Sequence, residues 1–250
     1  MAPRLLADLR VLLTRPAGDG LDEWAAAFVD VGATAILYPT IAAVSPPSWK
    51  QVDAALARLG DYDWLIFTSQ TAVAFFLGRL PHRRFSANQR PKIAAVGAKT
   101  AEAIEAAGGG VAVVPDDRRQ EGLVQALSDV ASGTRVLVPM AAGGRTFLAD
   151  KLRAKGCSVD VVTVYETLAK IDLSQPPAFD VATFASPSAL RAFLAGPGQV
   201  TLAGKTVVVI GPTTADEARV HGLVPVVAES PSVQDLIRAI AASRVAKGDP

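Results

Sequence analysis

The sequence predicts an α/β protein made of two similar parallel-sheet domains that arose from a duplicated half-chain. Short β-branched runs alternate with Ala- and Leu-rich helical stretches along the 250 residues. This alternation is typical of parallel sheets with helices on both faces. The stretch 63–73 reappears at 180–190, and the stretch 95–101 reappears at 209–215. With 50% hydrophobic residues, the chain can bury one or two cores, and the duplication favours two.

Short apolar runs define the expected strands. They lie at 11–13, 35–37, 65–67, 93–96, 111–114, 136–138, 159–164, 181–184, 207–210 and 224–227. Helices with apolar spacing separate these runs, and glycines at 32, 108, 156 and 222 are placed to end four of them. The Pro-rich or polar stretches 45–47, 80–91 and 174–177 indicate loops, and a last helix is expected at about 232–246.

Charge and cysteine content limit the kinds of partner. Lys and Arg total 25 against 24 Asp and Glu, so the overall charge attracts neither nucleic acid nor a membrane surface. The single cysteine, Cys157, excludes an internal disulfide and is expected in a core. The opening segment has the charges Arg4, Asp8 and Arg10, which do not fit a signal peptide, and no run is long enough to span a membrane. We expect a cytoplasmic protein.

Hydroxyl and glycine residues follow four of the expected strands. They form two hydroxyl turns and two glycine turns: Thr68-Ser69, Ser186-Pro187-Ser188, Gly97 to Thr100, and Gly211 to Thr214. Such residues cap helices, and a helix N-terminus also attracts carboxylates or phosphates. Capping alone explains any one turn. Four turns at the carboxyl ends of parallel strands, where open α/β sheets bind ligands, favour a polyanion site in a cleft between the domains.

The sequence lacks the usual catalytic and cofactor motifs. His82 lies in a basic loop and His221 near a helix end, and neither has the companions that a metal site needs. No strand is followed by a P-loop lysine motif or by G-x-G-x-x-G, which disfavours nucleotide and nicotinamide cofactors. Tyr165 ends a Val-rich run and is either a half-buried packing residue or a phenolic acid. Arg15 and Arg145 are expected at helix starts, where a cation opposes the helix dipole and invites either a ligand or simple solvation.

Taken together, these motifs resemble the uroporphyrinogen-III synthase family. The resemblance covers about 200 residues, and it depends on the order and spacing of its parts. The parts are Thr14-Arg15-Pro16, Tyr38-Pro39, Thr68-Ser69, Ala95-Val96-Gly97 with Thr100, Arg145 with Leu152 and Gly156, Val164-Tyr165, Ser186-Pro187-Ser188, and Ile210 to Ala215.

The resemblance implies a particular domain organisation. Two flavodoxin-like or Rossmann-like domains are expected, one from residues 1–40 plus 168–250 and the other from residues 46–162. Extended linkers at 41–45 and 163–167 would form a two-stranded connection. Because such linkers are thin, we expect the domains to flex relative to each other, and we expect a monomer.

The resemblance also implies an activity. Members of the family cyclise hydroxymethylbilane, a linear tetrapyrrole, to uroporphyrinogen III with loss of water and inversion of the last ring. No cofactor is implied, since the pyrrole nitrogens stabilise the cation left by the departing hydroxide. Tyr165 matches the linker tyrosine proposed to help the hydroxyl leave. Carboxylates would be held by Arg15, Thr68, Ser69, Thr100, Arg145, Ser186, Ser188, Thr213 and Thr214. Transient contact with the preceding enzyme, hydroxymethylbilane synthase, is also implied.

Two positions depart from the family pattern, and one alternative function stays open. Thr71 stands where members often carry Asn, and Ala185 stands where they often carry Thr. Binding through backbone N–H groups would tolerate both changes. The alternative is a tetrapyrrole- or polyanion-sensing domain on the same scaffold without catalysis. Such a sensor would be expected to carry an output domain, and only one helix follows residue 227.

Overall fold

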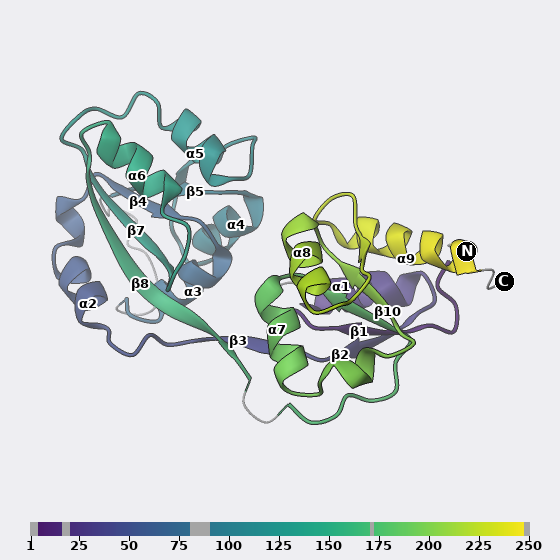
Figure 1. Ribbon diagram of the computed structural model, residues 1–250. Coiled ribbons are helices and arrows are strands. Elements are labelled where there is room, and N and C mark those ends of the chain that lie inside the picture. The colour runs from purple at the N-terminus through teal and green to yellow at the C-terminus, as the bar shows by residue number, and fades with distance from the viewer. Residues whose placement is uncertain (1–4, 17–20, 81–90, 171–172, 248–250) are drawn as a thin grey trace. The chain divides into compact units, whose positions relative to one another are not determined.

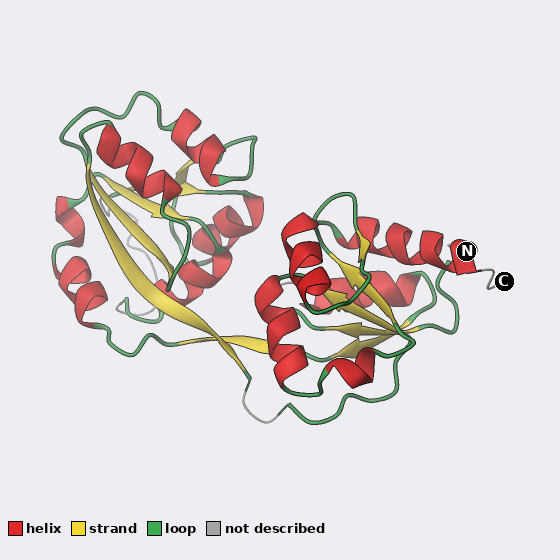
Figure 2. Cartoon of the chain, viewed as in Figure 1, coloured by secondary structure: helices red, strands yellow, loops and turns green. Residues whose placement is uncertain are grey.

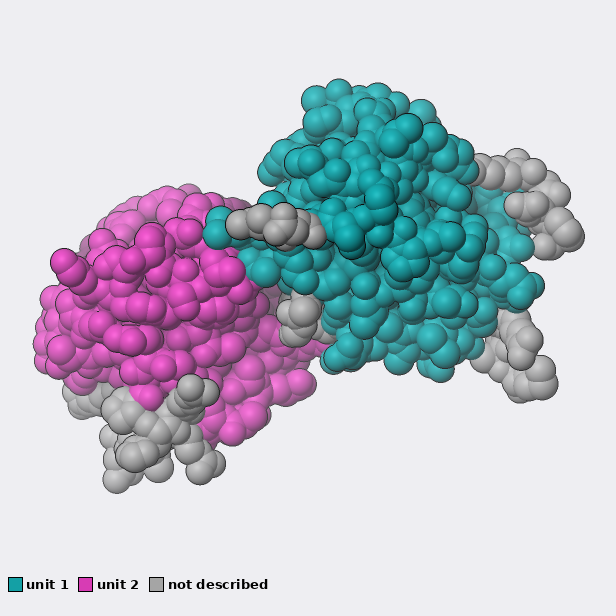
Figure 3. Space-filling model, turned by 90° about the horizontal axis from the view of Figure 1, so that it is seen from below, with its two compact units in different colours: residues 1–42, 168–250 teal, residues 43–167 magenta. Residues whose placement is uncertain are grey.

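The computed structural model describes residues 5–16, 21–80, 91–170 and 173–247. The chain divides into two compact units, coloured separately in Figure 3. Unit 1 comprises Met1–Ala42 and Leu168–Pro250, and unit 2 comprises Ala43–Thr167. Each unit holds one mostly parallel sheet with helices on both faces (Figures 1 and 2), so the predicted α/β class is confirmed.

Unit 1 contains a five-stranded sheet in the order β11-β10-β9-β1-β2. Its strands are β1 (Arg10–Leu13), β2 (Thr34–Leu37), β9 (Val181–Phe184), β10 (Thr206–Val209) and β11 (Val226–Val227). Its helices are α1 (Leu21–Asp30), α7 (Pro187–Ala195), α8 (Pro212–Val220) and α9 (Val233–Lys247), with a 3₁₀ turn at Gln199–Leu202. The last helix therefore lies where it was predicted.

Alternate residues of β1 point to opposite faces of this sheet. Leu12 packs with the core under α7 and α8, whereas Val11 and Leu13 pack with α1 and α9. All three side chains are fully buried. A strand covered on both faces reads as a continuous apolar run, which is why β1 could be recognised in the sequence.

A second sheet, which lies mainly in unit 2, has six strands in the order β3-β8-β7-β4-β5-β6, and one end of β3 and of β8 belongs to unit 1. Its strands are β3 (Ile41–Val44), β4 (Trp64–Phe67), β5 (Lys92–Ala95), β6 (Val111–Val113), β7 (Arg135–Ala141) and β8 (Ser158–Ala169). The residues expected as extended linkers, 41–45 and 163–167, therefore fall largely within the neighbouring strands β3 and β8.

Helices cover both faces of this sheet as well. They are α2 (Lys50–Ala57), α3 (Gln70–Leu77), α4 (Ala98–Ala106), α5 (Gln120–Ala126) and α6 (Phe147–Ala154), with a 3₁₀ turn at Leu59–Asp61. Buried residues of α2, α3 and α4 share one core, and those of α5 and α6 share the other. Cys157 lies buried in the second core, as predicted.

Glycines end helices where the sequence predicted. Gly32, Gly108, Gly156 and Gly222 have φ values of 90°, 82°, 87° and 71°. This left-handed conformation is costly for residues with a Cβ atom, so glycine is the usual choice at a helix end.

An aspartate and an arginine are paired at the amino edge of each sheet. In unit 1 the Asp180 carboxylate accepts hydrogen bonds from the backbone N–H and the guanidinium of Arg10, over 2.8–3.0 Å. In unit 2 the Asp63 carboxylate accepts from the backbone N–H of Arg135 at 2.9 Å. The aspartate precedes β9 or β4, and the arginine begins β1 or β7. The duplicated sequence thus builds the same contact twice.

The Asp180 contact generates a stability prediction. The hydrogen bonds and charge of Arg10 lower the pKa of Asp180 from 3.8 to about 2. The resulting stabilisation is fully present above pH 3.8 and is lost as the pH falls through about 2. We expect Asp180→Asn to lower the free energy of unfolding by about 1–2 kcal/mol at pH 7. Urea denaturation at several pH values measures this, and the difference from the unmodified protein should vanish near pH 2.

Asp216→Asn is the matched control, because it removes an exposed aspartate that pairs with Arg219 within one helix. It should cause a much smaller loss. An equal loss from both variants would contradict the structural role of Asp180.

Candidate functional site

The carboxyl ends of neighbouring strands gather the predicted turns within each unit. In unit 1, the turns after β10, β9 and β1 are neighbours because these strands are adjacent. In unit 2, the turns after β5, β4 and β7 are neighbours for the same reason, with β8 beside β7. Helices leave β1 and β9 towards opposite faces of the sheet, and so do the helices after β4 and β7. These are the topological switch points at which open α/β sheets bind ligands.

Serine side chains cap the two helices that follow the hydroxyl turns. Ser69 Oγ accepts from the backbone N–H of Ala72 at 3.0 Å, and Ser186 Oγ accepts from that of Ala189 at 3.2 Å. Both serines have extended backbones, as N-cap residues do. The capping role of Ser69 and Ser186 is confirmed. Their hydroxyls are half-buried, as are Thr68 and Ser188, and Ser188 Oγ lies 3.0 Å from Ser186 Oγ.

The glycine turns present backbone more than hydroxyl groups. Gly97 and Gly211 are the N-caps of α4 and α8, and neither helix has a side-chain cap. Thr100 and Thr214 are only 5% and 3% exposed, whereas Thr213 is exposed. A ligand at these turns would therefore contact backbone N–H groups and the side chains of Lys99 and Thr213, which precede the two buried threonines.

Tyr165 lies at the same edge of the sheet as Ser69. Its hydroxyl oxygen is 3.5 Å from Ser69 Oγ, at the outer limit of a hydrogen bond. Its ring stacks on Phe75 of α3, with centroids 5.5 Å apart and an interplanar angle of 23°. The backbone of Tyr165 is also held, because its carbonyl accepts from Ala142 N–H at 2.8 Å. The residue is half-buried: its ring packs on Phe75, and its hydroxyl lies at the edge of the candidate site.

Arg145 follows a turn that requires glycine. Gly143 has φ of 65°, and a Cβ atom at Gly144 would lie 2.6 Å from Met140 Cε. The Arg145 guanidinium forms an ion pair with Glu121 and lies 4.6 Å from the ring centroid of Phe147. This pairing lowers the pKa of Glu121 below its ordinary value. Arg145 is therefore an exposed cation whose charge is compensated within unit 2.

Arg15 lies in unit 1 at the end of β1. Its guanidinium carbon is 4.2 Å from the ring centroid of Trp24 in α1. We expected it at a helix start; the described part of α1 begins at Leu21, and residues 17–20 between them lie outside the described ranges.

Gln120 of unit 2 holds the start of α6, although sequence analysis did not single it out. Its side-chain N–H donates to the Arg145 carbonyl at 2.9 Å, and its side-chain oxygen accepts from Leu148 N–H at 3.0 Å. Gln120 thereby caps α6 from the neighbouring helix α5. No sequence motif indicates such a contact, since it depends on how two helices pack.

The remaining predicted features lie away from these turns. His221 follows the last residue of α8, as predicted, with Nε2 3.1 Å from a Glu217 oxygen. His82 lies outside the described residues. Within the described ranges, no three His, Cys, Asp or Glu side chains are grouped to hold a metal. No helix there is long and apolar enough to cross a bilayer.

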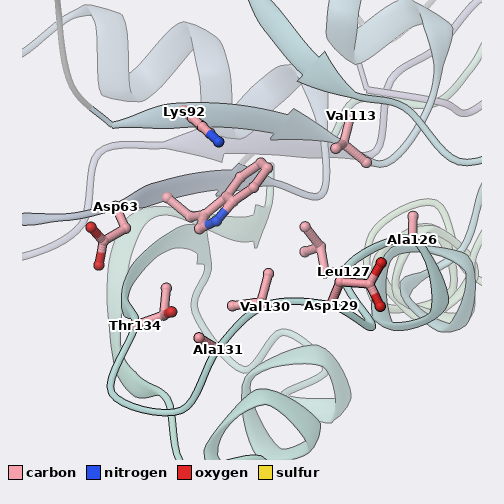
Figure 4. Close-up of a pocket in the computed structure, with 10 residues that line it drawn as sticks. Asp63, Lys92, Val113, Ala126, Leu127, Asp129, Val130, Ala131 and Thr134 are labelled. Atoms are coloured by element: carbon pink, nitrogen blue, oxygen red, sulfur yellow. The ribbon is translucent and has the colours of Figure 1, made fainter.

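A cavity in unit 2 lies at the opposite edge of the sheet from the turns (Figure 4). It has a volume of about 480 Å³, and Asp63, Trp64 and Lys92 line it at the amino ends of β4 and β5. Lys92 Nζ is 5.7 Å from the centroid of the Trp64 ring. Because the predicted residues lie at the carboxyl ends, this cavity is separate from the candidate site.

The fold and turns define a class of protein: a two-unit α/β protein with repeated anion-attracting helix N-termini at its switch points. Comparison with known proteins identifies the family. The family described as "Uroporphyrinogen-III synthase HemD" matches residues 22–238. The chain belongs to the uroporphyrinogen-III synthase family, and the predicted resemblance is confirmed.

Relatives and solved structures agree with this membership. The chain is 36% identical over 169 residues to uroporphyrinogen-III synthase of Synechococcus elongatus, covering 67% of this chain and 64% of that protein. It is 26% identical to porphyrin biosynthesis protein HemD of Ruminiclostridium josui, covering 91% of this chain and 47% of that protein. It is 29% identical to uroporphyrinogen-III synthase of Escherichia coli K12, covering 64% and 66%. The matches therefore span less than two thirds of these relatives.

Among solved structures, uroporphyrinogen-III synthetase from Helicobacter pylori has a TM-score of 0.63 at 19% identity, covering 94% of this chain and 100% of that one. A mutant uroporphyrinogen III synthase from Thermus thermophilus has a TM-score of 0.53 at 17% identity, covering 97% and 100%. These likenesses establish the fold.

The caps generate a stability prediction. Ser186→Ala leaves the first turn of α7 without an acceptor, so we expect the free energy of unfolding to fall by about 1 kcal/mol. Ser69→Ala should act likewise on α3. Chemical denaturation measures both losses. Ser188→Ala is the control, because the Ser188 hydroxyl lies 3.0 Å from Ser186 Oγ and, within the described ranges, caps no N–H group. Equal losses from Ser186→Ala and Ser188→Ala would contradict the capping role.

Proposed function

We propose that this protein cyclises hydroxymethylbilane to uroporphyrinogen III, with loss of water and inversion of the last pyrrole ring. Family membership supports the proposal. The observation that carries it is the position of the Tyr165 hydroxyl, 3.5 Å from Ser69 Oγ at a capped helix start. A proton donor beside an anion-attracting turn suits a substrate that carries carboxylates and must lose a hydroxyl group.

The proposed chemical step needs a proton donor and accurate positioning. Tyr165 would donate to the departing hydroxyl as general acid. The pyrrole nitrogens of the substrate would stabilise the cation that remains, so no cofactor is proposed. The ring would then close through a spiro intermediate at the substituted carbon of the last ring. Holding that ring in place is the main contribution of the protein.

Carboxylates of the substrate would bind at the turns and at the two arginines. Because Ser69 and Ser186 already cap their helices, we propose that adjacent backbone N–H groups make most of these contacts. Thr68, Ser188 and Thr213 would add hydroxyl donors. Thr100 and Thr214, being buried, would act mainly by shaping their turns. Arg145 and Arg15 would contribute positive charge, with Arg145 exchanging Glu121 for substrate.

The rest of the proposed setting follows the sequence expectations. We propose that units 1 and 2 are the domains expected at 1–40 plus 168–250 and at 46–162. The proposed location is the cytoplasm, the proposed form is a monomer, and neither nucleic acid nor a membrane is proposed as partner. Because hydroxymethylbilane also closes without an enzyme, transient contact with hydroxymethylbilane synthase would shorten its time in solution.

The first experiment supplies freshly generated hydroxymethylbilane to the purified protein and separates the oxidised isomers by chromatography. Isomer III above the spontaneous background is expected. We expect Tyr165→Phe to lower kcat about 10- to 100-fold without abolishing the reaction, since the positioning groups remain.

Tyr62→Phe is the matched control for this variant. The Tyr62 hydroxyl donates to Asp160 at 2.5 Å, and the buried residue lies at the amino side of β4. Its kcat should stay unchanged. Isomer I alone from the folded protein would contradict the proposed function and favour a binding-only domain, and an unchanged rate for Tyr165→Phe would exclude the acid role.

A second pair of variants tests carboxylate binding at α3. Ser69→Asp and Ser69→Asn both keep an N-cap side chain, so both should fold. The Asp variant places a negative charge where a substrate carboxylate is proposed, and we expect its KM to rise at least about tenfold. The neutral Asn variant should keep a KM near that of the unmodified protein. Equal KM values for the two variants would contradict anion binding at this turn.

A further inference from the structure

The segment between β6 and α5 is held by two glycines. A Cβ atom at Gly122 would lie 2.0 Å from the carbonyl oxygen of Asp117, so only glycine lets this segment rest on α5. A Cβ atom at Gly97 would lie 3.5 Å from Cβ and Cγ of Arg118 and 3.6 Å from Cδ. The stem of Arg118 therefore packs across the turn that begins α4.

The neighbouring charges leave Arg118 uncompensated. Arg119 forms two hydrogen bonds with the Asp117 carboxylate, at 2.8 and 3.1 Å. Arg145 pairs with Glu121. Over the ranges that the structure describes, no group forms a hydrogen bond or ion pair with Arg118, and its side chain is exposed. Of the three acidic side chains near Arg118, Asp117 and Glu121 are thus paired with other arginines, and the exposed Asp116 forms no ion pair with Arg118 within the described ranges.

The stem of Arg118 lies beside the start of α4, where the helix dipole disfavours a cation and favours an anion. A helix N-terminus carries partial positive charge, so a cation beside the start of α4 is repelled. Gly97 supplies no side-chain acceptor to offset this, unlike Ser69 and Ser186. An anion placed there would be attracted by both the helix and the guanidinium. Since β5 is adjacent to β4, the place lies on the same edge as Ser69 and Tyr165.

The duplicated half provides an internal comparison. Gly211 begins α8 in unit 1 as Gly97 begins α4 in unit 2. Among the residues that the structure describes, and apart from its chain neighbours and the backbone of α8, no heavy atom lies within 4 Å of a Cβ atom built at Gly211. The repeated turn therefore forms without an arginine across it, and the stability of the turn does not account for Arg118.

We propose that Arg118 is a substrate-binding residue that holds one carboxylate of the tetrapyrrole together with the first turn of α4. This inference rests on the proposed function, because that function supplies a polycarboxylate ligand. Arg118 would strengthen substrate binding and help to determine which carboxylate-bearing ring of the tetrapyrrole lies at this position. It would take no part in forming or breaking bonds.

The test measures binding of uroporphyrin III by isothermal titration, which requires no turnover. Arg118→Gln should raise Kd about tenfold, as expected for the loss of one charge-assisted contact. The Kd of Arg118→Lys should lie between those of Arg118→Gln and the unmodified protein, because lysine keeps the positive charge but lacks the planar guanidinium that can bind a carboxylate with two hydrogen bonds. Arg119→Gln removes the same charge one residue away and should change Kd less than about twofold. Added salt should reduce the difference in Kd between Arg118→Gln and the unmodified protein, because salt screens the charge of Arg118.

The outcomes separate this inference from the proposed function. An unchanged Kd for Arg118→Gln, an equal change for Arg119→Gln, or no binding by the unmodified protein would overturn the role of Arg118. Binding that depends on Arg118, combined with formation of isomer I alone, would reject the catalytic function and keep the binding residue. All variants should melt at the same temperature, because the altered side chains are exposed.

Discussion

Parallel pairing at the two switch points is the constraint on which the rest of this structure depends. β1 pairs with β9, and β4 pairs with β7, although each pair is far apart in the sequence. Thr14 Oγ1 donates to the Thr183 carbonyl at 2.7 Å, and Thr183 Oγ1 donates to the Leu12 carbonyl at 3.0 Å. These buried bonds and the Asp180–Arg10 contact fix the register at both ends. As a result, the turns after β1, β9 and β10 share the carboxyl edge of the unit 1 sheet.

The helix-starting turns at the carboxyl edge of each sheet present mainly backbone groups. The serines satisfy first-turn N–H groups, two threonines are buried, and Gly97 and Gly211 offer no side chain. Thr71 lies in the first turn of α3, and Ala185 directly precedes the N-cap of α7. Charged side chains also lie near the turns of unit 2, where Arg119 is paired with Asp117 and Arg145 with Glu121.

Sequence reasoning succeeded where a local signal decides the structure. The buried strands are apolar runs, the helix ends carry glycine, and Ser69 and Ser186 precede their helices directly, so each could be predicted. It failed where distant segments meet. The cap that Gln120 provides to α6, and the stem of Arg118 across Gly97, depend on packing between segments that are 28 and 118 − 97 = 21 residues apart. The burial of Thr100 and Thr214 likewise depends on which face of the helix meets the sheet.

The split composition of unit 1 has a consequence for how the chain is made. Unit 2 is one continuous stretch, whereas β1, α1 and β2 precede it and β9, the partner of β1, follows it. During synthesis at roughly 5–20 residues per second, β1 waits on the order of ten seconds for that partner. In that time the backbone N–H and C=O groups of β1 that will pair with β9 have no partner strand. Nascent unit 1 is therefore the part that chaperones would need to protect, while unit 2 can fold as soon as it emerges.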